Sequence, residues 1–154
     1  MKKVVGLLAI LFTAAFLPSV SANEKPSIAI IDTAIDTSKV NIAYEVCILY
    51  EARCPNKSSF MEGPGAATVS APSVYLNGFE HGTIMSLIAN KINPNANIIF
   101  IRIAGISKTG TMYSFSDLEV TKALDWAIAN KTKYNINTIT KIIITLGFDN
   151  KLLM

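Results

Sequence analysis

The sequence predicts a three-layer α/β domain in which helices flank a mostly parallel sheet. Four segments are almost continuously apolar, which is typical of strands buried on both faces. Two segments with apolar residues at helical spacing alternate with the later strands, as in a sheet built from β-α-β units. No internal repeat or low-complexity tract interrupts this order.

Residues 1–22 have the features of a secretory signal peptide. Lys2 and Lys3 precede an apolar run over 4–17, and the small-residue sequence 20–22 supplies a cleavage site. We therefore expect one domain over 23–154 in a secreted or periplasmic protein that is free of the membrane after cleavage. The alternative is an uncleaved N-terminal anchor.

Charge and cysteine content exclude two classes of site. The sequence has 14 Lys+Arg against 11 Asp+Glu, and two of the basic residues belong to the expected signal peptide. No dense basic face remains, so we expect no nucleic-acid partner. Cys47 and Cys54 form either a disulfide, which export favours, or two free thiols. Without a further Cys or His cluster they do not predict a zinc site.

The first half of the chain contains two predicted strands and a long loop. The strand over 27–31 ends abruptly at Asp32, and polar residues at the carboxyl ends of buried strands are where α/β folds carry their chemistry. Alternatively, Asp32 caps a turn or the next helix. A second strand is expected over 40–49, followed by a loop over 51–75 that has no clear period.

The second half alternates helices with strands. A mostly buried helix is expected over 82–91, with its apolar residues at Ile84, Met85, Leu87, Ile88 and Ala89 and a stop at Asn93-Pro94-Asn95. A third strand over 97–103 and a loop over 105–115 follow it.

Ser116 and Glu119 form a capping box that predicts a helix from there to about Asn130. Its apolar face comprises Val120, Ala123, Leu124, Ala127 and Ile128. Trp126 is expected at the edge of this helix as a packing residue rather than a ligand-binding one. A fourth strand, over 138–146, has no later helix to cover it, so the sheet is expected to be incomplete at its C-terminal side.

His81 is the single histidine of the chain, and Gly82 and Thr83 follow it directly at the start of the predicted helix. Most such histidines are surface or structural residues. A histidine at a helix start and an aspartate at the end of a buried strand can also act together, with the imidazole as base and the carboxylate as its orienter. Of the known orders of Asp, His and Ser in such triads, Asp before His is consistent with that of subtilisin.

Several segments resemble the subtilase family, in the family's order and over nearly all of 23–154. The sequence Ile30-Ile31-Asp32-Thr33-Ala34 resembles the family's Asp motif, and His81-Gly82-Thr83 resembles the start of its His motif. The segments 96–103, 114–130 and 145–147 resemble the strand, helix and cleft segment that follow.

The resemblance implies a secreted serine endopeptidase that acts on polypeptides, with Asp32 and His81 as catalytic residues. It implies that Gly110, Thr145, Leu146 and Gly147 bind substrate. Calcium is common in the family, but no Asp/Asn spacing identifies a site here, so no metal or cofactor is assigned.

This sequence departs from the family at several positions. Ala34, Ile84 and Ser86 replace the usual residues of the Asp and His motifs, and no Gly-Thr-Ser nucleophile segment occurs. We therefore expect the N-terminal half of a peptidase, inactive alone, whose partner is a complementing C-terminal half. The alternative is a non-catalytic peptide-binding module or pseudoprotease. A phosphate-binding α/β domain is disfavoured because no Gly-rich phosphate loop is present.

Overall fold

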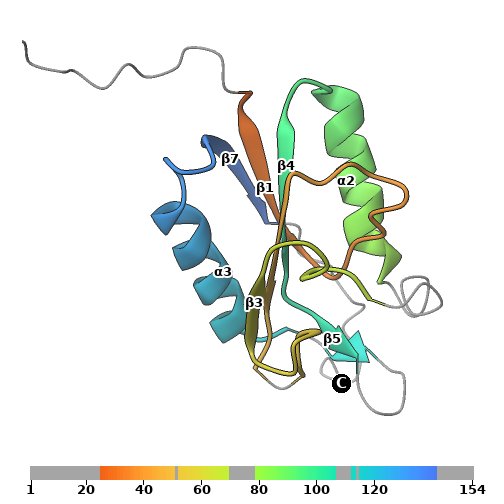
Figure 1. Ribbon diagram of the computed structural model, residues 1–154, viewed down its shortest axis with the longest axis vertical. Helices are drawn as coiled ribbons and strands as arrows, with labels where there is room; N and C mark the ends of the chain where they lie inside the picture. Colours follow the sequence, from red (N-terminus) through yellow and green to blue (C-terminus); the bar gives the residue numbers. More distant parts are fainter. Residues whose placement is uncertain (1–24, 51, 70–78, 107–111, 114, 142–154) are drawn as a thin grey trace, which may run out of the picture.

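A mixed α/β architecture with a five-stranded, mostly parallel sheet is present in the computed structural model (Figure 1). The structure describes residues 25–50, 52–69, 79–106, 112–113 and 115–141. The strand order is β3-β2-β4-β1-β7, and every pair is parallel except the antiparallel pair of β2 with the edge strand β3. The strands are β1 (Ser27–Asp32), β2 (Tyr44–Ile48), β3 (Phe60–Glu62), β4 (Asn97–Arg102) and β7 (Ile136–Lys141). The predicted α/β class and parallel sheet are confirmed.

The central strand β1 presents one apolar surface to each face of the sheet. Ile30 packs in a cluster with Phe100 of β4, and Ala89 of α2 (Glu80–Ile92) lies against this cluster. Ile31, the next residue along the strand, packs in another cluster with Ala123 of α3 (Asp117–Ala129). Successive side chains of a strand point to opposite faces, so α2 and α3 cover opposite faces of the sheet (Figure 1). This double coverage explains the continuous apolar runs.

One strand prediction was wrong in extent, and two predicted loops contain short strands. The second strand starts at Tyr44 rather than at residue 40, and residues 40–43 form irregular structure between it and a turn that the Lys39 N–H closes by donating to the Asp36 carbonyl. The predicted loop 51–75 contains β3, and the predicted loop 105–115 contains the two-stranded ribbon β5–β6 (Gly105–Ile106 and Met112–Tyr113). Strands of two or three residues carry no period that a sequence pattern could show.

The last strand begins two residues earlier than predicted. β7 starts at Ile136, whose side chain is buried and whose N–H donates to the Lys131 carbonyl after α3. The predicted strand continued to residue 146 with its centre at 141–144, and of these residues only Lys141 lies within the described part of the chain. Among the described residues, β7 pairs with β1 and with no other strand.

The prediction that the helix over 82–91 is mostly buried was wrong. Only Gly82, Thr83 and Ser86 of α2 are buried, because the helix packs chiefly on β1 with one face. Ile84, Leu87 and Ile88 are between 43% and 47% exposed, and Ile92 is 79% exposed. The predicted stop at Asn93-Pro94-Asn95 agrees with the end of α2 at Ile92.

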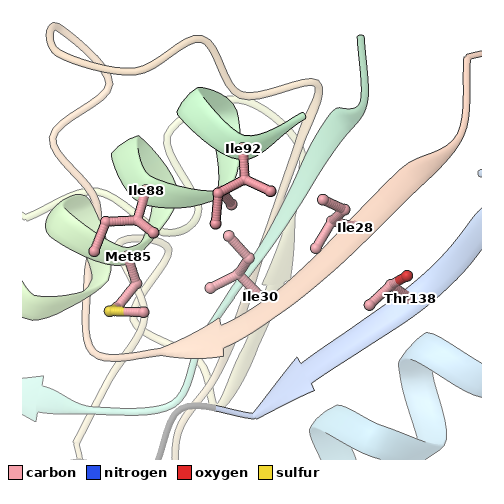
Figure 2. A pocket seen from close by; sticks show the side chains of 7 residues that line it. Ile28, Ile30, Met85, Ile88, Ile92 and Thr138 are labelled. Carbon is pink, nitrogen blue, oxygen red and sulfur yellow. The ribbon is translucent and has the colours of Figure 1, made fainter. Parts of the chain in front are cut away.

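An open groove of about 210 Å³ runs between α2 and the strands β1 and β7. Figure 2 shows Met85, Ile88 and Ile92 of the helix on one side, and Ile28 and Ile30 with Thr138 on the other. Ala89 completes the lining. Apart from the Thr138 hydroxyl, these side chains carry no polar group for chemistry. The groove is therefore a place for apolar packing rather than for catalysis.

The capping box predicted the start of α3 correctly. Ser116 is the N-cap, its hydroxyl contacts the Glu119 carboxylate, and the Ser116 N–H donates to that carboxylate at 2.9 Å. Trp126 lies at the edge of the helix as predicted, and its Nε1–H donates to Glu62 at 3.1 Å. Ile128, which was expected on the apolar face, is 63% exposed, whereas Val120, Ala123 and Ala127 are buried in the core cluster.

Replacing Glu119 with Gln is expected to make stability less dependent on pH. Burial alone would raise the pKa of Glu119, but hydrogen bonds from Ser116 and from the Tyr50 N–H outweigh it and hold this pKa below its ordinary value of 4.5. The charged form therefore stabilises the fold above about pH 4.5, and this contribution disappears as the pH falls through the lowered pKa. Glu119→Gln should cost roughly 1–2 kcal/mol at pH 7 and less at pH 3.

Urea unfolding at both pH values measures this difference. Asp125→Asn on the exposed face of α3 is the control, and it should change stability little at either pH. An equal cost of Glu119→Gln at pH 3 and pH 7 would show that the carboxylate charge contributes nothing.

Candidate functional site

Asp32 is the last residue of β1, at the carboxyl edge of the sheet. Its side chain is fully buried, and Oδ1 accepts the Thr33 N–H at 2.6 Å and lies 3.1 Å from the Thr33 hydroxyl. β1 lies between β4 and β7, so Asp32 ends an interior strand of the sheet rather than an edge strand. A carboxylate that is buried but hydrogen-bonded in this way is held in one orientation.

His81 meets this carboxylate from the first turn of α2. Its Nδ1 lies 2.9 Å from Asp32 Oδ2 and 3.0 Å from Oδ1, and its side chain is 29% exposed. An ionised carboxylate only accepts hydrogen bonds, so in the neutral imidazole the proton belongs on Nδ1. The unprotonated Nε2 can then accept a proton from a hydroxyl or a water molecule.

Gly82 allows the start of α2 to approach the loop after β1. A Cβ atom at this position would lie 2.3 Å from the Ala34 carbonyl oxygen and 2.6 Å from Phe100 Cζ. The Gly82 N–H donates to the Thr33 hydroxyl at 3.2 Å, and this hydroxyl is 3.0 Å from the Phe79 carbonyl oxygen. Thr33 therefore joins the Asp32 carboxylate to the backbone on both sides of His81.

Thr83 makes a second connection between the same two segments. Its buried hydroxyl accepts the Asp36 N–H at 3.0 Å, four residues after Asp32. Thr33 thus reaches from the strand end to the helix, and Thr83 reaches from the helix to the loop after the strand. The two threonines fix the distance between Asp32 and His81.

Arg102, at the end of β4, ties the neighbouring loops to this edge of the sheet. Its Nε donates to the Ala104 carbonyl at 2.8 Å and its Nη1 to the Thr68 carbonyl at 3.0 Å, and the guanidinium lies over the Phe79 ring. Burial lowers the pKa of Arg102 to about 10, so the group stays charged at neutral pH. In the register of the sheet, Arg102 is the direct neighbour of Asp32.

The structure brings together some of the predicted site residues and not others. Asp32 and His81 are in contact although 49 residues separate them. Cys47 and Cys54 form a disulfide at the end of β2. Gly110, Thr145, Leu146 and Gly147 lie outside the described residues, as do residues 1–22. Sequence reasoning missed the roles of Thr33 and Thr83. The signal for both was a hydroxyl residue shortly after each half of the Asp-His pair, one residue after Asp32 and two residues after His81.

Comparison of the chain with family models, curated proteins and solved structures finds no match. Function therefore has to be argued from the geometry of the site.

The described residues were also considered for a metal-binding group and for a membrane-spanning helix. In the part of the chain that the structure describes, His, Cys, Asp and Glu side chains form no group of three or more that could hold a metal ion. Within that same part, each helix is too short or too polar to cross a membrane.

Proposed function

We propose that this chain is the N-terminal part of a secreted, subtilisin-like serine endopeptidase with a three-layer α/β fold. In it His81 is the general base and Asp32 its orienter. The observation that carries the proposal is the contact of His81 Nδ1 with both oxygens of the buried Asp32 carboxylate. The resemblance of the Asp and His motifs to those of subtilases supports it.

The geometry suits proton transfer from a nucleophile. Asp32 holds the imidazole proton on Nδ1, which leaves Nε2 as the basic nitrogen of a ring whose side chain is 29% exposed. When Nε2 takes a proton, the imidazolium gains a full ion pair with a carboxylate that Thr33 already orients.

The nucleophile has to come from another segment. The 154 residues contain no Gly-Thr-Ser sequence, and removal of the nucleophile from a Ser-His-Asp triad costs on the order of 10⁶ in kcat. The chain by itself is therefore inactive, and its partner is a C-terminal segment that supplies the serine and the oxyanion donor. The missing Gly-Thr-Ser also favours a second candidate function, that of a non-catalytic peptide-binding module.

Reading the transcript beyond the Met154 codon separates the two functions. The peptidase proposal expects codons for an Asn and then for a Gly-Thr-Ser segment in a continuing frame. If no frame encodes them, the peptidase proposal loses its nucleophile and the binding module is favoured.

A further inference from the structure

We propose that the disulfide-closed loop 47–54 positions the β5–β6 ribbon, and that peptide binding by this chain depends on that support. The inference rests on the proposed function, because it assigns the ribbon to the peptide-binding side of the Asp32–His81 site. It also makes a structural claim that can be tested without any substrate.

The loop is fixed from three directions. The Cys47–Cys54 disulfide closes it at the end of β2, and both cysteines are buried. The Leu49 N–H donates to the Ser59 carbonyl at 2.8 Å, which ties the loop to the segment before β3. The Tyr50 N–H donates to Glu119 Oε1 at 3.1 Å, which ties it to the start of α3.

The ribbon lies directly on this loop. A Cβ atom added to Gly105 would be 2.1 Å from Ala52 Cβ and 3.8 Å from Leu49 Cδ1, so no free space separates the first residue of β5 from the loop. Ala52 and Leu49 belong to the same buried cluster as the two cysteines. The position of Gly105 is thus set by side chains inside the disulfide-closed loop.

The ribbon needs such support because it is very small. β5 and β6 form two residue pairs, Gly105 with Tyr113 and Ile106 with Met112. A two-stranded ribbon is only marginally stable alone even when it is much longer. Its orientation therefore depends on what it packs against.

The ribbon also starts next to the candidate site. β5 follows β4 after two residues, and the Ile103 N–H donates to the Asp32 carbonyl at 2.9 Å. Among the described residues, β5 and β6 pair only with each other, which leaves an outer edge on each strand. An extended peptide can add to such an edge through main-chain hydrogen bonds. A shift of the ribbon would change that edge while Asp32 and His81 stay in place.

Two variants of the full chain test the inference. Cys47→Ala/Cys54→Ala opens the loop, and Ala52→Gly removes the methyl group that touches Gly105 while keeping the disulfide. Ala66→Gly is the matched control, because Ala66 lies in the same buried cluster but is not among the nearest contacts of Gly105. The measurements are amide hydrogen exchange at Gly105 and Ile106, binding of fluorescein-labelled casein, and the ¹⁵N NMR signals of the His81 ring.

Both test variants should speed exchange at Gly105 and Ile106 and weaken casein binding about tenfold or more, with the His81 signals unchanged. The control Ala66→Gly should change neither the exchange at Gly105 and Ile106 nor the binding of casein. Unchanged exchange in both test variants would overturn the inference, and so would faster exchange with unchanged casein binding. If the unmodified chain does not bind casein but exchange responds as expected, the proposed peptide-directed function fails and the support of the ribbon by the loop stands.

Discussion

Asp32→Asn is expected to move the proton of the neutral His81 ring from Nδ1 to Nε2. The Thr33 N–H points at Oδ1 from 2.6 Å, so the amide oxygen of Asn should take that position. The amide nitrogen then faces His81 Nδ1, which lies 2.9 Å from the present Oδ2. Because an amide nitrogen only donates, Nδ1 has to become the acceptor. The variant should keep the fold but lose the free Nε2 that a general base needs.

The ¹⁵N chemical shifts of the ring show which nitrogen carries the proton, and the single histidine makes the assignment direct. Asp36→Asn is the control, because the Asp36 carboxylate accepts hydrogen bonds from the N–H and the hydroxyl of Ser38, within the loop after β1. It should leave the His81 signals as they are. A ring that carries its proton on Nδ1 in Asp32→Asn as well would contradict the orienting role of Asp32.

Gly82→Ala is expected to destabilise the domain although alanine favours helices. Helix propensity alone would favour alanine by up to about 1 kcal/mol. The new Cβ, however, would lie 2.3 Å from the Ala34 carbonyl oxygen and 2.6 Å from Phe100 Cζ, and a backbone atom cannot simply rotate away. Overpacking of this kind costs roughly 1–3 kcal/mol, so the net change should be a loss of stability.

The displacement should also reach His81, because the helix start has to move away from the loop that carries Ala34. Urea unfolding measures the stability, and the His81 ring signals report the local change. Asn90→Ala on the exposed side of the same helix is the control and should be neutral or slightly stabilising. A Gly82→Ala variant as stable as the unmodified chain would show that the close approach at this position is not needed.

The interior strands β1 and β4 were predictable because strands buried on both faces have continuous apolar sequences. β1 and β4 appear in the sequence within one residue of their observed ends. The start of α3 was predictable because Ser116 and Glu119 satisfy the helix terminus through their own side chains. These signals are local, so one sequence is enough to find them.

The predictions that were wrong concern features that tertiary contacts determine. The apolar residues of α2 predicted a buried helix, but burial depends on what covers the helix, and Ile84, Leu87 and Ile88 remain between 43% and 47% exposed. β3 and the β5–β6 ribbon form because other segments lie beside them, and their few residues carry no pattern.

The candidate site was predictable in part for the same reason. Asp32 and His81 could be identified by their places at a strand end and a helix start. Thr33 and Thr83 could not be assigned, because their roles depend on hydrogen bonds between segments that are about 50 residues apart. The sequence shows a hydroxyl residue at each position but not its partner.

The central claim is that Asp32 and His81 serve peptide hydrolysis. The direct test is kcat for casein hydrolysis by this chain joined to the serine-bearing segment that the proposal requires. His81→Ala should lower kcat on the order of 10⁶-fold and Asp32→Asn about 10⁴-fold, while Asp36→Asn should retain activity. Hydrolysis within tenfold of the unmodified protein in His81→Ala would contradict the account.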